Sequence, residues 1–187
     1  MSILERRYGG LVSASVGTDA GLTALGDALR RDFDCDRVSI YLREKRGDFV
    51  SIYAEGLTNM TLAVKSGEGI VGKCIALRAP VVSNHAPYDP DALCRVRDNF
   101  SGYATSSLLA APILGLLGRA LGAVQLVNKN IGLFTPHDVD RLRHAARGMR
   151  RIVRLVAPPY VNLWKPNPHS RQTNENHNPP EIQRAAH

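Results

Sequence analysis

The sequence has no apolar run of the roughly 18 residues that a membrane-spanning helix requires, so no membrane partner is expected. Its three cysteines form no even set and no Cys-x-x-Cys pair, which excludes a disulfide framework and predicts a cytoplasmic location. The first residues lack the continuous apolar segment of a secretory signal. Histidines and cysteines at metal-ligand spacing are lacking too, so neither a metal nor a cofactor is expected.

What is present is the composition of one soluble domain: 187 residues, of which 44% are hydrophobic and 22% are charged. The net charge of +7 is uneven, because residues 136–187 hold 9 basic and only 4 acidic residues. Such a local excess of positive charge indicates a surface that binds a partner and gives no information about the fold.

The hydrophobic pattern predicts a mixed α+β domain. A helix begins at Thr18, with leucines at steps of three and four residues, and alternating apolar residues on either side of Gly47 predict a β-hairpin. A short strand and a short helix follow in LAVKSGEGIVGKCIAL, and two apolar strands in SLLAAPILGLLGRALGAVQLVNK. We expect a central antiparallel sheet with the N- and C-terminal helices on one face and a ligand pocket under loops and short helices on the other.

The last helix begins at Thr135, a hydroxyl N-cap followed by proline and then an acid at the third helical position. Its apolar residues repeat every three or four positions, which is typical of a dimer seam. They are Val139, Leu142, Ala146, Met149, Val153 and Val156. We predict a homodimer, to which Leu22, Leu25 and Leu29 could contribute. The domain is expected at residues 18–157, after an N-terminal extension (1–17) and before a Pro/Asn-rich disordered tail (158–187).

Five arginines of this helix fall on one arc of about 100° and predict a surface for a separate signalling protein. They are Arg143, Arg147, Arg150, Arg151 and Arg154. No base-reading motif accompanies them, so nucleic acid is not the expected partner.

Two segments favour a pocket for a small polar ligand. In GEGIVG, glycines surround Ile70 and Val71 at a helix start, where free backbone amides favour an anion. In DNFSGYATSS, a carboxylate and hydroxyls from Asp98, Ser101 and Thr105 gather before an apolar strand. The alternatives are a tight turn for the first segment and local loop capping for the second.

Four fragments in this order resemble a GAF domain, especially the type found in cyclic-nucleotide phosphodiesterases and adenylyl cyclases. They are SGEGIVGKCIALRAPVVSN, DNFSGYATSSLLAAPI, GAVQLVNK and FTPHD, and the resemblance covers roughly residues 18–155. In that type, an Asn-Lys…Phe-x-x-x-Asp-Glu signature supports the pocket. Its counterparts are Asn128, Lys129, Phe134 and Asp138, with Val139 in place of the glutamate. The resemblance implies an ion pair between Lys129 and Asp138.

The resemblance also implies the ligand contacts. They are Ser39, Glu55, Ile70, Val71, Asp98, Ser101, Thr105 and Gln125, with Cys94 where the family often has an aromatic ring. The expected ligand is small and anionic or nucleotide-like, such as a cyclic nucleotide.

The expected function is that of a stand-alone sensor without catalytic residues. One alternative is an interaction and dimerisation module that binds no ligand. A second is a free methionine sulfoxide reductase, a GAF enzyme with a reactive thiol, for which Cys74 and Cys94 are the candidates. A bilin attached to Cys94 is a further possibility, although Arg95 replaces the histidine usual there.

Overall fold

The computed structural model describes residues 1–14, 19–44, 47–56, 61–92 and 103–152. Its helices are α1 (Ile3–Ala14), α2 (Asp19–Phe33), α3 (Gly69–Leu77) and α5 (Pro136–Gly148), with short 3-10 turns η1 (Ala86–Tyr88) and η2 (Met149–Arg151). Its strands are β1 (Cys35–Arg43), β2 (Phe49–Ala54), β3 (Ala63–Val64), β4 (Val81–Ser83), β5 (Leu108–Leu114) and β6 (Ala120–Lys129). None of the described helices is long and apolar enough to cross a membrane.

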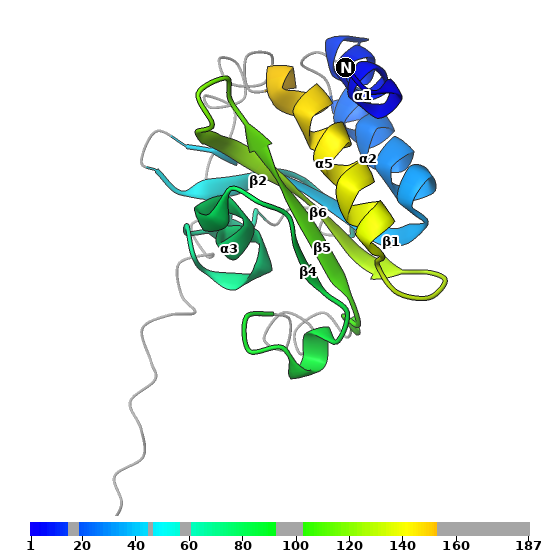
Figure 1. Cartoon of the computed structure of the whole chain (residues 1–187), viewed down its shortest axis with the longest axis vertical. Helices are drawn as coiled ribbons and strands as arrows, with labels where there is room; N and C mark the ends of the chain where they lie inside the picture. Colours follow the sequence, from blue (N-terminus) through cyan, green and yellow to red (C-terminus); the bar gives the residue numbers. More distant parts are fainter. Residues whose placement is uncertain (15–18, 45–46, 57–60, 93–102, 153–187) are drawn as a thin grey trace, which may run out of the picture.

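The strands form one antiparallel sheet in the order β3-β2-β1-β6-β5-β4 (Figure 1). The two long strands β1 and β6 lie in the middle, where both faces of the sheet are covered. Alternate residues of β1 therefore enter two different cores: Val38 and Ile40 pack on one face, and Tyr41 on the other.

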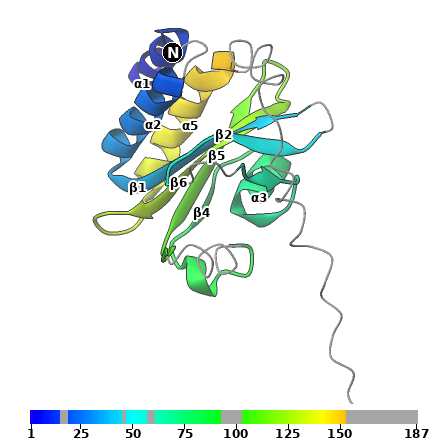
Figure 2. The ribbon, with the colours of Figure 1, turned by 180° about the vertical axis from the view of Figure 1, so that it is seen from behind.

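Helices α1, α2 and α5 cover one face of the sheet, and α3 covers part of the other (Figures 1 and 2). The three-helix side holds the larger core, which includes Leu25 and Leu29 of α2 and Leu142 of α5. The α3 side holds a smaller cluster built around Tyr41, Ile70 and Cys74. This arrangement confirms the predicted α+β class and the helices on one face.

Helix α5 begins as the sequence predicts. Thr135 Oγ1 accepts a hydrogen bond from the backbone N–H of Asp138 at 3.2 Å, and the Asp138 carboxylate accepts one from the backbone N–H of Thr135 at 3.0 Å. This reciprocal capping satisfies two amide donors that a bare helix end would leave without partners.

The apolar seam of α5 faces inward, contrary to the predicted use in a dimer. Leu142, Ala146 and Met149 are fully buried against the sheet and α1 within one chain, and Val139 is partly buried there. The α2 leucines are likewise buried in this core. Val153 and Val156 lie outside the described residues. An apolar stripe shows only that one face of a helix is covered, and here the chain itself covers it.

The predicted N-terminal extension contains helix α1, which packs on α5. Tyr8 and Val12 are buried, and the Tyr8 hydroxyl donates to Asp32 Oδ2 at 2.8 Å. The two helices cross so closely that a Cβ at Gly148 would lie 2.4 Å from the Glu5 carbonyl oxygen. Helix α1 therefore belongs to the folded unit, a feature that its mixed polar sequence did not predict.

Candidate functional site

A row of polar side chains crosses the face of the sheet that α3 covers. Ser39 of β1 pairs with Gln125 of β6, and Gln125 pairs with Ala110 of β5. Because paired residues point to the same face, these three side chains lie in one line across the sheet. Ser39 is 7% exposed and Gln125 is 2% exposed, so hydrogen-bonding groups are buried inside an otherwise apolar cluster.

Tyr41 extends this row by one step along β1. Its hydroxyl donates to Gln125 Oε1 at 3.4 Å, and its neighbours across the sheet include the small residue Ala123. Sequence reasoning did not single out Tyr41, although its place two residues after Ser39 puts it on the same face of the strand. We call Ser39, Tyr41 and Gln125 the polar row. Together they supply hydroxyl and amide groups that can donate and accept hydrogen bonds.

The first turn of α3 lies over the same face. The side chains of Ile70 and Val71 are buried in the α3-side cluster, while their backbone amides belong to the start of the helix. The N-cap Glu68 makes no side-chain capping bond, so its carboxylate does not close this end. A Cβ at Gly72 would lie 2.2 Å from the Lys65 carbonyl oxygen, which explains the glycine there. A helix start of this kind favours an anion.

Thr105 is buried at the end of the segment that leads into β5. The Asn128 side chain holds this segment: its Oδ1 accepts from the backbone N–H of Ser106 at 2.7 Å, and its Nδ2 donates to the Ala104 carbonyl at 2.8 Å. Asn128 itself has φ 53°, a left-handed conformation that asparagine tolerates better than most residues. Three other predicted contacts, Cys94, Asp98 and Ser101, lie outside the described residues.

Glu55 is the predicted contact that the structure separates from this row. It follows β2, where its backbone N–H donates to the Val38 carbonyl, and its side chain meets Arg30 of α2, so it lies toward the face covered by α2. There its Oε1 pairs with an Arg30 guanidinium nitrogen at 2.8 Å, whereas its Oε2 is buried with no hydrogen-bond partner. Burial raises the pKa of Glu55 above its usual value, and Arg30 opposes that rise.

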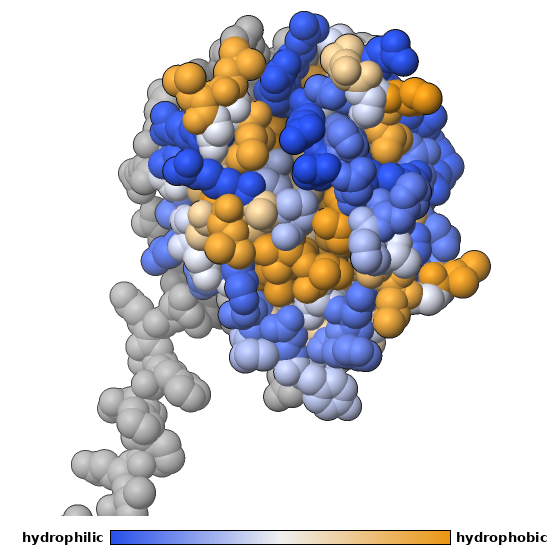
Figure 3. Space-filling model, in the orientation of Figure 1, coloured by the Kyte–Doolittle hydropathy of each residue, from blue (hydrophilic) through white to orange (hydrophobic). Residues whose placement is uncertain are grey.

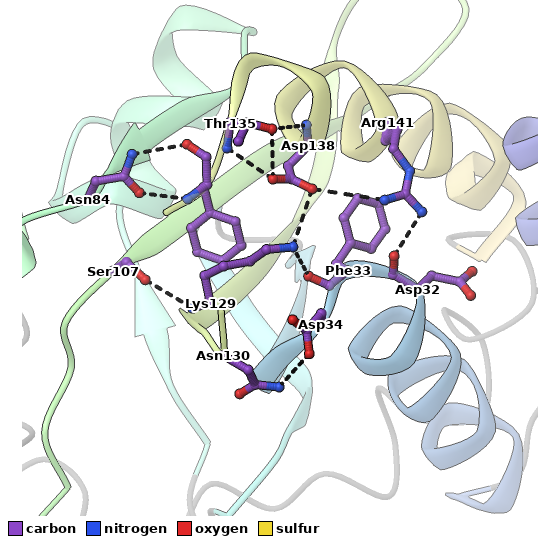
Figure 4. A network of polar contacts seen from close by, with 11 residues as sticks. Asp32, Phe33, Asp34, Asn84, Ser107, Lys129, Asn130, Thr135, Asp138 and Arg141 are labelled. Atoms are coloured by element: carbon purple, nitrogen blue, oxygen red, sulfur yellow. Dashed lines mark hydrogen bonds and ion pairs between the residues drawn. The ribbon is translucent and has the colours of Figure 1, made fainter. Parts of the chain in front are cut away.

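The predicted signature residues form a network at the base of α5 (Figure 4). The Lys129 ammonium donates to the Phe33 carbonyl oxygen at 2.6 Å and lies 3.5 Å from Asp138 Oδ1, so the expected ion pair is present. The buried Phe134 is held by Asn84, whose side chain bonds both its backbone N–H and its carbonyl at 3.0 Å. These contacts join the ends of α2 and β6 to the start of α5.

Neither described cysteine has the surroundings of a reactive thiol. Cys74 of α3 is buried against the sheet, and burial raises its pKa to about 12. Burial likewise raises the pKa of Cys35 to about 12, with a smaller contribution from Glu55. Both thiols are therefore protonated near neutral pH, whereas the nucleophilic form of cysteine is the thiolate.

One hollow of about 410 Å³ lies at the turn from α2 to β1, apart from the polar row. Its lining groups already bond to neighbours: Asn130 donates to Asp34 at 3.0 Å, and Arg30 pairs with Glu55. Among the described residues, no cluster of histidine, cysteine or carboxylate groups is arranged to hold a metal ion.

A six-stranded antiparallel sheet, with three helices on one face and a short glycine-flanked helix over buried polar residues on the other, defines the class of this α+β domain. The sequence profile of the GAF domain family matches residues 19–149, and the chain belongs to that family. A curated relative, the "Probable 3',5'-cyclic phosphodiesterase pde-5" of Caenorhabditis elegans, is 24% identical over 140 residues. That match covers 67% of this chain but only 19% of the relative, so the chain spans about a fifth of the relative's length.

Solved structures agree on the fold. The GAF domain of a phosphoenolpyruvate-protein phosphotransferase from Coxiella burnetii is similar with a TM-score of 0.67 and 19% identity, covering 82% of this chain and 92% of that one. A free methionine-R-sulfoxide reductase from Neisseria meningitidis, in complex with its substrate, is similar with a TM-score of 0.64 and 20% identity, covering 81% and 87%. At such identities the likeness concerns the fold alone.

Proposed function

We propose that this domain is a sensor that binds a small anionic or nucleotide-like ligand between the sheet and α3. The observation that carries the proposal is the buried row of Ser39, Tyr41 and Gln125 beside the small residues Ala110 and Ala123. Tyr41 and Gln125 hydrogen-bond to each other, and hydroxyl and amide groups gathered on an otherwise apolar face can also donate to and accept from a small polar ligand.

The ligand's charge is matched by the start of α3. The backbone amides near Ile70 and Val71 favour an anion, and the polar row can hydrogen-bond a base or another planar polar group. A 3',5'-cyclic nucleotide combines these two features, and the curated relative is named as a cyclic phosphodiesterase. We expect the domain to work in the cytoplasm and to signal to a separate protein through the arginines of its last helix.

Thermal unfolding with and without 3',5'-cyclic GMP and cyclic AMP tests the proposal. A ligand at one hundred times its Kd stabilises the folded state by about 2.7 kcal/mol, which raises the Tm on the order of 8 °C for a domain of this size. Gln125→Met should abolish that rise by removing the amide. Glu55→Gln is the matched control, because it also alters a predicted contact, and it should keep the full rise.

Two outcomes would contradict the proposal. If neither nucleotide raises the Tm, cyclic-nucleotide binding is refuted, and screening of cyclic dinucleotides, 2-oxoglutarate and amino acids decides between another ligand and an interaction module. If Gln125→Met keeps the shift and Glu55→Gln loses it, the ligand binds on the face covered by α2 instead.

The reductase alternative has support from fold neighbours but not from the described thiols. Cys74 points into the α3-side cluster and is protonated near neutral pH. Consumption of free methionine sulfoxide in an NADPH-coupled assay, abolished by Cys74→Ser, would establish this alternative in place of the sensor.

A further inference from the structure

Two adjacent leucines stand exposed at the tip of the β5–β6 hairpin. The turn is closed by hydrogen bonds from the Gly115 N–H to the Arg119 carbonyl at 2.9 Å and from the Gly118 N–H to the Gly115 carbonyl at 3.1 Å. Leu116 is 80% exposed and Leu117 is 97% exposed. Turns of this kind are ordinarily polar, and an adjacent exposed apolar pair on a fixed turn marks an interaction surface.

Exposed arginines lie at the same end of the sheet as this tip. Strand β1 ends beside the start of β6, with Leu42 paired to Gly122, which brings the exposed Arg43 to the same end of the sheet as Arg119. The turn η2 contacts β5, and its Arg150 and Arg151 are exposed. The end of α5 and the β5–β6 turn lie together at the top of the molecule (Figure 1). We call the set Leu116, Leu117, Arg43, Arg119, Arg150 and Arg151 the basic tip.

The surface view agrees with this arrangement. Hydrophobic surface lies over the β5–β6 turn at the upper left, and strongly hydrophilic surface lies directly beside it (Figure 3). The β1–β2 hairpin adds the partly buried Glu44 and Asp48, which reduce the positive charge of this end without reversing it.

We propose that the basic tip docks on an anionic lipid surface, with Leu116 and Leu117 inserted among the headgroups and acyl chains and the arginines against lipid phosphates and carboxylates. Apolar side chains on an exposed turn, with arginines at the same end of the sheet, match the two attractions that hold a peripheral protein on such a surface. A second copy of the chain does not fit, because it would bring arginines against arginines.

This use of the tip is compatible with ligand binding, because the polar row faces α3 within the sheet, whereas Leu116 and Leu117 lie beyond the strand ends in the exposed turn. It assigns Arg150 and Arg151 to the lipid surface and leaves the exposed Arg143 and Arg147 of α5 to the signalling protein that the sequence predicts. Binding to vesicles is measured without any nucleotide, so failure of one proposal leaves the other unaffected.

Co-sedimentation of the full chain with vesicles is the first test. The chain should bind vesicles of phosphatidylcholine with phosphatidylserine, bind phosphatidylcholine alone only weakly, and lose binding as salt is raised. Leu117→Ser should reduce the partition coefficient about tenfold. The matched control is Ile131→Ser, because Ile131 is also 80% exposed but lies in the β6–α5 loop at the opposite end of the sheet. That control should bind like the unaltered chain.

The charge requirement is tested separately. Arg150→Glu should weaken binding to the anionic vesicles on the order of tenfold. Arg31→Glu changes the net charge equally but lies at the end of α2, next to the start of β1, and should have little effect. Absence of binding to anionic vesicles, or equal losses in the tip variants and their controls, would overturn the proposal. The leucine pair would then belong to a protein partner or to non-specific association.

Discussion

Burial and an ion pair act in opposite directions on the pKa of Glu55. Its Oε1 meets Arg30, while its Oε2 is buried with no partner. The net result is a pKa above the usual value, so ionising Glu55 costs more in the folded chain than in the unfolded one. This residue therefore lowers stability at neutral pH, and that penalty disappears once the pH falls below its ordinary pKa.

Glu55→Gln should consequently raise the midpoint of urea unfolding at pH 7, because the amide resembles the neutral acid. Near pH 3 the two proteins should unfold at the same urea concentration, since Glu55 is protonated in both states there. Parallel urea titrations at the two pH values measure this. A lower midpoint for the variant at pH 7 would show that the Arg30 pair outweighs burial.

At the scale of elements, the contact between α1 and α5 depends on glycine. The backbones approach so closely at Gly148 that any side chain there would meet the Glu5 carbonyl oxygen and, at 3.0 Å, the Gly9 nitrogen. Arg7 and Tyr8 then reach the Asp32 side chain at the end of α2. Helix α1 thus joins two elements that also meet through Lys129 and Arg141.

Gly148→Ala should force α1 away from α5 and cost about 2 kcal/mol, because backbone rather than a flexible side chain blocks the methyl group. Hydrogen exchange should show loss of protection in residues 3–14. Gly10→Ala is the control: a Cβ there meets nothing within 4 Å, and alanine favours the helix by up to about 1 kcal/mol. Equal stability of the two variants would contradict the close crossing.

At the scale of the whole molecule, the last helix serves the core of its own domain. Its apolar stripe is covered by the sheet and α1. Four of the five predicted arginines are exposed, namely Arg143, Arg147, Arg150 and Arg151, and Arg154 lies outside the described residues. A homodimer stays a prediction, and it would have to use surfaces other than this buried seam.

Leu142→Ala should therefore leave a cavity in the core and destabilise the domain by about 3 kcal/mol. Urea unfolding measures the loss, and the mass of the native variant from sedimentation should equal that of the unaltered chain. A variant that remains as stable but changes from dimer to monomer would show that the seam lies between subunits.

The sequence by itself determined the order of the elements from α2 to α5 except β4, the GAF family and the capping of α5, because these depend on local spacing and on short motifs; it did not predict α1. It also placed Ser39 and Gln125 among the candidates, although only the register of β1 against β6 shows that they are paired. That Asp98, Ser101 and Cys94 contact the ligand stays a prediction, because these residues lie outside the described part of the chain.

Tertiary structure alone decided which surfaces the apolar stripes cover and which face Glu55 joins. A repeat of three and four residues states that one side of a helix is apolar, not whether its cover comes from the same chain or another. The alternation of side chains between the two faces of a sheet is also interrupted at a bulge, so residues beyond it cannot be assigned to a face by counting. Such a shift in the register of β1 and β2 lies between Ile40 and Tyr41. That Arg43, Arg119 and Arg150 lie at the same end of the sheet as the two exposed leucines depends on contacts between distant segments, which no local pattern encodes.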